Sequence, residues 1–198
     1  MFDTLTERGL RQRTVEWNMK RNKLEYDVKL ERKMLHEEFR EFMEAETLVD
    51  RLDAFVDFMF VFIGTEAKYL YSINHMINGE PLAHTDVQYL LNVDSYYEYM
   101  EQQVKHEVVN FLFDNEISEY FCYDVAGEVI TKVYEIVLEA NEQKTQVGAD
   151  GKITKPADFY PPEGKIQELL INLKNEFKRL NEMSIGDVKV YRKAVQDA

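Results

Sequence analysis

Carboxylate side chains recur at helical spacing in two neighbouring segments of the chain. Glu38 and Glu41 are three residues apart, so a helix there would place both on one face. In the next segment, Asp50, Asp53 and Asp57 follow an i, i+3, i+7 pattern and would form one line along a helix. Carboxylates gathered in this way are the ligands of hard cations such as Mg²⁺ or Mn²⁺, and a free one can act as a general base.

The aspartate line lies in an apolar run. Almost every other position from Leu52 to Ile63 is apolar, which is typical of a helix buried on nearly all sides, so Asp57 and Asp53 are expected inside the protein. Buried carboxylates without a compensating cation cost roughly several kcal/mol. Arg51 lies on another face of the expected helix, so it does not supply the compensating positive charge. A divalent metal would supply it. Gly64, seven residues beyond Asp57 and on the same line, predicts a gap through which a ligand enters.

Two structural alternatives stay open. Glu37, Glu38 and Glu41 taken alone are compatible with a solvated helix face, as we expect for Glu44 and Glu46. For the aspartates, the less favoured alternative is neutralisation by lysine or arginine side chains from another helix.

Helical periodicity dominates the whole chain and predicts an all-α helical bundle. We expect one domain over residues 1–198, with helices over residues 24–45, 47–78, 85–114, 117–142 and 165–183, and with Gly64 as a candidate break in the second. Between residues 145 and 163 the density of Gly and Pro predicts a short hairpin or loop. Val147 and residues 153–154 would pair around the Asp150-Gly151 turn.

Composition narrows the function classes. The 198 residues are 45% hydrophobic and carry a net charge of −13, which argues against a general nucleic-acid or anionic-membrane binder. Cys122 is the only cysteine, which excludes an internal disulfide, and we expect it to be a packing residue. No apolar leader or membrane-length segment is present, and a cytoplasmic location is expected. Phosphate-binding glycine loops and common hydrolase motifs are absent.

Charge is unevenly distributed. Residues 8–33 contain nine basic and four acidic residues, whereas residues 41–142 contain four basic and 21 acidic ones. Lysines return at Lys144, Lys152 and Lys155. A polyanionic ligand would be repelled by the acidic middle unless a cation intervened, while the two flanking segments could receive it directly.

Three segments, in order, resemble the MazG-like all-α nucleoside triphosphate pyrophosphohydrolases. Residues 37–41 and 50–65 are similar to the E-E-x-x-E motif of one helix and the acidic E-x-x-D motif of the next. Residues 141–144 and 150–156, continuing to Phe159 and Pro161-Pro162, look like the signature of the phage-type and phosphoribosyl-ATP pyrophosphohydrolase-like branch. The resemblance implies an enzyme that hydrolyses a (d)NTP to the (d)NMP and pyrophosphate with Mg²⁺, Mn²⁺ being an alternative. It also implies a homodimer or homotetramer.

The resemblance also implies roles for individual residues. The catalytic carboxylates would be Glu37 and Glu38, with Glu37 taking the proton of the attacking water. The metal ligands would be Glu38, Glu41, Asp50, Asp53 and Asp57, and the phosphates would be approached by Asn141, Lys144, Lys152 and Lys155.

The chain departs from the family pattern in three places. Asp50 stands where the family usually has Glu, and the spacer before it is short, so Asp53 with Asp57 could serve in place of Asp50 with Asp53. Residues 79–115 match no part of the family and would be a helical insertion. The alternative function is a non-catalytic assembly or regulatory protein that retains the bundle.

Overall fold

The computed structural model describes residue 5 and residues 8–21, 26–75, 84–147 and 153–198. In this part of the chain the protein is helical except for one two-stranded hairpin, which confirms the expected all-α class. The elements are α2 (Leu10–Arg21), α3 (Val28–Glu44), α4 (Leu48–His75), α5 (His84–Asp114), α6 (Glu119–Gln143), β1 (Gln146–Val147), β2 (Ile153–Thr154), α7 (Pro162–Glu182) and α8 (Val188–Asp197).

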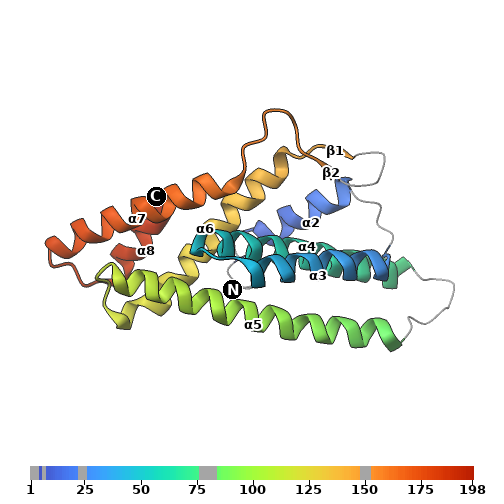
Figure 1. The fold of residues 1–198 in the computed structure, drawn as a ribbon, viewed down its shortest axis with the longest axis horizontal. Helices are drawn as coiled ribbons and strands as arrows, with labels where there is room; N and C mark the ends of the chain where they lie inside the picture. The colour runs from blue at the N-terminus through green and yellow to red at the C-terminus, as the bar shows by residue number, and fades with distance from the viewer. Residues whose placement is uncertain (1–4, 6–7, 22–25, 76–83, 148–152) are drawn as a thin grey trace.

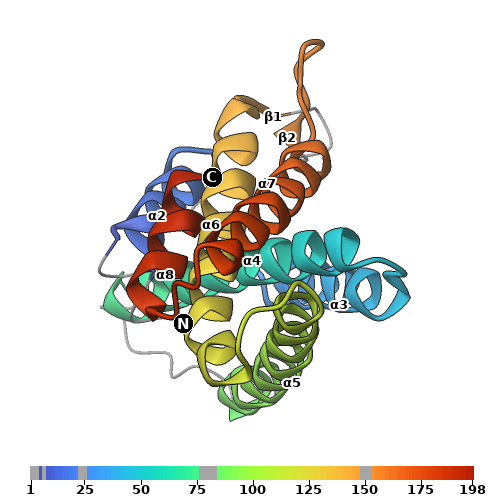
Figure 2. The same cartoon turned by 90° about the vertical axis from the view of Figure 1, so that its left-hand side faces the viewer.

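Helix α4 lies at the centre of the fold. It packs against α2, α3, α5, α6 and α7, because its side chains are apolar on nearly every side, as its sequence predicts. Figure 1 shows α3, α4 and α5 extending side by side along the long axis, with α6 crossing them. Figure 2 shows α7 and α8 together against α6. The predicted hairpin is confirmed, and it pairs Val147 with Ile153 in antiparallel register.

Helices α3 and α4 form an antiparallel pair joined by residues 45–47. Asp27 caps the start of α3, where its Oδ1 accepts hydrogen bonds from two backbone N–H groups. Thr47 caps α4: its Oγ1 accepts from the Asp50 backbone N–H over 3.1 Å and donates to Asp50 Oδ2 over 2.7 Å. The two caps fix where each helix begins, and therefore which faces of α3 and α4 meet.

A buried ion pair lies between α3 and α4. Lys68 Nζ donates to Glu31 Oε1 over 2.7 Å, and Thr65 Oγ1 donates to Glu31 Oε2 over the same distance. Glu31 is 1% exposed and Lys68 is 6% exposed. Glu31 is two helical turns before Glu38, so the pair lies on the same face of α3 as that carboxylate. It therefore sets the register in which the carboxylates of the two helices face each other.

The expected break and gap at Gly64 are wrong. Helix α4 is continuous from Leu48 to His75. Gly64 is buried against α2, where an added Cβ atom would come within 2.6 Å of the Asn18 side-chain oxygen. The space beside Gly64 is thus filled by Asn18, and the absence of a side chain allows close packing of two helices rather than entry of a ligand.

Helices α2 and α8 were not anticipated from the sequence. α2 docks through the buried side chains of Leu10 and Trp17, which belong to the hydrophobic core. Arginines in α2 and just before it also pair with glutamates of α4 and α6: Arg8 with Glu128 and Glu135, Arg11 with Glu66, and Arg13 with Glu142. The sequence led us to expect that this basic segment could receive a polyanionic ligand. These three arginines do not meet that expectation, because glutamates within the molecule compensate their charges.

Residues of α5 share the core of the other helices. Val93, Met100, Val104 and Leu112 are fully buried within one hydrophobic cluster that also includes residues of α4 and α6. The expected insertion at residues 79–115 therefore packs as part of the bundle where it is described. Cys122 is fully buried, as expected for a packing residue. No helix in the described segments is both long enough and apolar enough to span a bilayer.

Candidate metal and phosphate site

An acidic cavity of about 430 Å³ opens where the end of α3, the start of α4 and the start of α7 meet. Four of the five expected metal ligands line it. Its lining consists of Ala45, Thr47 and Ala54 together with the acidic residues Glu41, Glu44, Glu46, Asp50, Asp53, Asp57 and Glu163. Every charged residue of this lining is negative, so the cavity favours a cation or a ligand that brings one.

Asp57 connects the acidic cavity to the residues that were expected to contact phosphate. Asn141 Nδ2 on α6 donates to Asp57 Oδ1 over 3.3 Å, and Lys144 Nζ donates to Asn141 Oδ1 over 2.6 Å. Burial raises the pKa of Asp57, and Lys144, the Asn141 hydrogen bond and Lys155 oppose the rise. The structure thus brings three expected phosphate-contacting residues, Asn141, Lys144 and Lys155, to an expected metal ligand.

Glu38 and Asp53 are two further carboxylates on which the charge of Asp57 acts. Burial, with the nearby charge of Asp57, raises the pKa of Glu38 to about 8. The same two causes, in the same order, raise the pKa of Asp53 to about 8. Glu38 Oε2 and Asp53 Oδ1 are both buried and accept no hydrogen bond from the described residues. Each is therefore a carboxylate oxygen that has lost water without gaining a protein donor.

A hard cation fits this donor set. Oxygen ligands on two helices, two of them buried and unbonded, are what Mg²⁺ or Mn²⁺ would require. As placed in the described segments, no three His, Cys, Asp or Glu side chains already form a group that could hold a metal ion. The fit consequently rests on the chemistry of the donors and on the two unbonded oxygens.

The remaining expected site residues take different positions. Glu37 is partly buried, and its charge contributes to the raised pKa of Glu38 and of Glu41. Asp50 is exposed at the rim of the cavity, where it is hydrogen-bonded to Thr47. Lys152, expected to contact phosphate, lies outside the described residues.

Glu163 and Trp17 belong to the site, although sequence reasoning missed them. Glu163 lines the cavity from the first turn of α7, and its charge contributes to the raised pKa of Asp53 and Asp57. Its position after Pro161-Pro162 indicates only a helix start. Trp17 Nε1 on α2 donates to the Asn141 carbonyl oxygen over 2.8 Å. No helix was expected there, so no pattern pointed to this contact.

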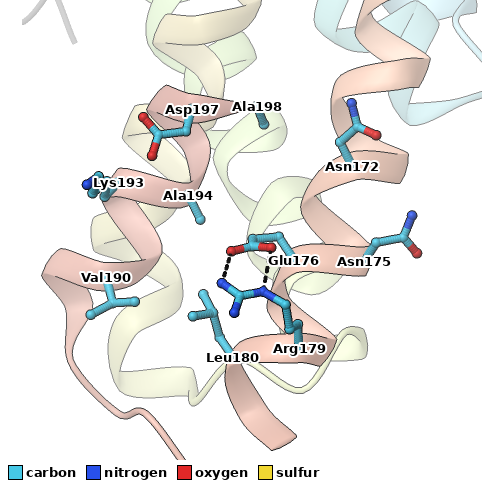
Figure 3. A pocket seen from close by; sticks show the side chains of 10 residues that line it. All are labelled: Asn172, Asn175, Glu176, Arg179, Leu180, Val190, Lys193, Ala194, Asp197 and Ala198. Atoms are coloured by element: carbon cyan, nitrogen blue, oxygen red, sulfur yellow. Dashed lines mark hydrogen bonds and ion pairs between the residues drawn. The ribbon is translucent and has the colours of Figure 1, made fainter. Parts of the chain in front are cut away.

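A second, larger cavity of about 700 Å³ lies between α7 and α8 (Figure 3). Arg179 is paired within the cavity, because its Nε and Nη2 donate to the two carboxylate oxygens of Glu176 over 2.9 and 2.5 Å. The lining includes none of the residues expected to carry chemistry. Size alone therefore does not make it the better candidate, and the acidic cavity has the groups that a reaction needs.

The site thus belongs to the class of buried, multi-carboxylate sites with lysines beside them. Comparisons of the chain with protein-family models, with curated proteins and with solved structures find no match. What the site does must be inferred from its own residues.

Proposed function

We propose that the chain is a Mg²⁺-dependent nucleoside triphosphate pyrophosphohydrolase of the MazG-like all-α type, in its phage-type and phosphoribosyl-ATP pyrophosphohydrolase-like branch. The reaction would convert a (d)NTP and water into the (d)NMP and pyrophosphate. One observation carries the proposal: Glu38 and Asp53 hold buried, unbonded carboxylate oxygens close enough to Asp57 to feel its charge, and Asn141 is hydrogen-bonded to Asp57.

The proposed ligands are Glu38, Glu41, Asp53 and Asp57, with Asp50 at the rim. The exposure of Asp50 and its hydrogen bond to Thr47 favour Asp53 with Asp57 as the deeper pair. Mg²⁺, or alternatively Mn²⁺, would neutralise the phosphate oxygens and lower the pKa of a bound water. Its binding requires Glu38 and Asp53 to lose the protons that their raised pKa values keep at neutral pH.

The protein's own groups would position the reactants and move one proton. Glu37, next to Glu38 and outside the proposed ligand set, takes a proton from the attacking water as the new P–O bond forms. The bond between the α- and β-phosphates breaks, and its electron pair leaves with the pyrophosphate. Lys144 and Lys155 bind the pyrophosphate group, which is already charged in the bound nucleotide, as positive charges. In this proposal the carboxylates of the acidic cavity activate the attacking water, and the lysines bind the departing pyrophosphate.

The test is pyrophosphate release from a panel of ribo- and deoxyribonucleoside triphosphates, with and without Mg²⁺. We expect release from at least one nucleotide, dependent on the metal, and loss of release in Asp53→Asn. Asp114→Asn is the matched control, because Asp114 is exposed at the far end of α5. No release from any nucleotide, together with no metal binding by calorimetry, would refute the proposal.

A non-catalytic assembly or regulatory protein is the second candidate. It is favoured by one observation, that no ready three-residue metal group exists in the described segments. The same assay separates it from the enzyme.

The proposed assembly is a homodimer or homotetramer. Phe113, Tyr120 and Tyr123 are 57%, 82% and 66% exposed at the turn between α5 and α6, and large exposed apolar side chains are typical of a contact surface. Light scattering of the protein and of Tyr120→Ser/Tyr123→Ser measures the state directly. A monomer at all concentrations would contradict this assembly.

A further inference from the structure

Phe159 lies beside two positive charges at once. The ammonium groups of Lys144 and Lys155 are 5.4 and 5.0 Å from the centre of its ring. Both distances are within the range in which the negative face of an aromatic ring attracts a cation. The three side chains are described from here on as the lysine–phenylalanine cluster.

The local backbone brings these residues together. The hairpin pairs Gln146 with Thr154, and the same register continued by one residue places Thr145 opposite Lys155. Lys144 comes just before that pair, at the end of α6. The chain then folds back, because the Phe159 backbone N–H donates to the carbonyl oxygen of Pro156 over 3.1 Å. This turn places the Phe159 ring beside Lys144 and Lys155, which the hairpin brings together.

Two lysines gathered at one place repel each other unless something opposes the repulsion. Lys144 donates a hydrogen bond to Asn141 Oδ1. The positive charges of Lys144 and Lys155 both oppose the rise in the pKa of Asp57. Lys155 is exposed, so without the ring its long side chain would be free to sample many rotamers in water. Phe159 is partly buried and limits that freedom while the ring face attracts the charge.

We propose that Phe159 is a positioning residue that holds Lys144 and Lys155 together at the edge of the acidic cavity, so that the pair binds the pyrophosphate half of the nucleoside triphosphate. This inference rests on the proposed function and deepens it. Phe159 acts through the lysines and touches no reacting atom.

The first experiment uses inorganic pyrophosphate with Mg²⁺ as the probe, with binding measured by calorimetry. Phe159→Leu keeps an apolar side chain but removes the ring face for both ammonium groups. We expect it to raise the Kd for pyrophosphate roughly 5- to 30-fold. Phe159→Tyr keeps the ring and should bind within about twofold of the wild type. Tyr160→Leu is the matched control, because it removes an exposed aromatic ring from the same loop.

The second measurement is steady-state turnover. Because the lysines meet phosphates that are charged before and after cleavage, Phe159→Leu should raise KM by the same factor as Kd and change kcat by less than about threefold. A general disturbance of the fold would lower kcat or the melting temperature instead.

A double-mutant cycle tests whether Phe159 acts through Lys155. Lys155→Gln in the wild type and in Phe159→Tyr should weaken pyrophosphate binding equally, whereas Phe159→Leu should add less in the Lys155→Gln background than alone. Fully independent effects, or wild-type pyrophosphate affinity in Phe159→Leu, would overturn the positioning role while leaving turnover intact. Absence of both turnover and pyrophosphate binding in the wild type would instead overturn the proposed function.

Discussion

Asn141 on α6 donates a hydrogen bond from its side-chain nitrogen to Asp57 on α4, over 3.3 Å. The orientation of this amide is fixed by Lys144, whose ammonium group can only donate and which binds the amide oxygen over 2.6 Å. The nitrogen must then face Asp57. The Asn141 amide therefore links Lys144 to a buried carboxylate, Asp57, which lies 84 residues from Asn141 in the chain.

Removing this amide should uncouple the lysine from the carboxylate. In Asn141→Ala, Asp57 loses a donor and Lys144 loses one acceptor, so we expect turnover to fall by at least about tenfold and the free energy of unfolding to fall by about 1–2 kcal/mol. Pyrophosphate release and urea denaturation measure the two effects. Asn175→Ala, which removes an exposed amide from α7, should change neither. Full activity in Asn141→Ala would show that the amide is dispensable.

The metal-free protein should lose stability with rising pH through Glu38. Burial raises its pKa to about 8, so the folded state keeps a proton that the unfolded chain releases near its ordinary pKa. The stabilisation is complete below about pH 4 and is lost as the pH rises to about 8. Glu38→Gln should accordingly gain melting temperature relative to the wild type from pH 5 to pH 8 in the presence of a chelator. A difference that stays constant or reverses sign would contradict the assignment.

Divalent metal should reverse that loss. Millimolar Mg²⁺ or Mn²⁺ is expected to raise the melting temperature, because a bound cation relieves the repulsion between the carboxylates and binds the folded state. Since Glu38 and Asp53 must release protons, the apparent affinity should rise with pH by up to about tenfold per unit for each proton. Calorimetry in two buffers of different ionisation enthalpy measures the proton release. K⁺ at equal ionic strength should have no such effect.

Neutralising Glu38 or Asp53 should abolish catalysis without unfolding the protein. Glu38→Gln and Asp53→Asn keep the side-chain volume and remove a metal ligand, so we expect turnover to fall by about 100-fold or more. Circular dichroism and melting curves should show a folded protein, more stable than the wild type when metal is absent. A wild-type rate in either variant would exclude that residue from the site.

Much of the site was predictable because it obeys helical periodicity. Asp53 and Asp57 are carboxylates at regular spacing in an apolar helix, and that contrast is visible in the sequence alone. Asn141 and Lys144 were identified only through the family resemblance. Their approach to Asp57 depends on how α6 crosses α4, which no local pattern encodes.

The missed parts share a physical cause. Helix α2 is polar, and its Arg11 and Arg13 are held by glutamates more than 50 residues away, Glu66 and Glu142. Charge pairing of this kind leaves no periodic trace. Glu163 was missed because a glutamate in a first helical turn is ordinary, and only the packing of α7 turns it toward the cavity. Gly64 was misinterpreted because a missing side chain can serve close packing as well as ligand entry.

The buried pair between Glu31 and Lys68 offers a test of how α3 is held on α4. Lys68→Met leaves Glu31 buried with only Thr65 as a donor, and should cost about 3–5 kcal/mol in the free energy of unfolding. The double variant Glu31→Leu/Lys68→Met removes both charges and should recover most of that loss. Urea denaturation measures both. Equal destabilisation of the single and double variants would mean that packing, and not the unpaired charge, is responsible.

The contact between Trp17 and the Asn141 carbonyl oxygen gives the molecule an optical reporter of its own. The chain contains one tryptophan, Trp17 of α2. Its indole is buried and donates to the backbone carbonyl oxygen of Asn141 on α6. Emission excited selectively in the indole, and not in the tyrosines, therefore comes from a single site within two hydrogen bonds of Asp57. Arrival of a ligand can be followed there in real time without an attached dye.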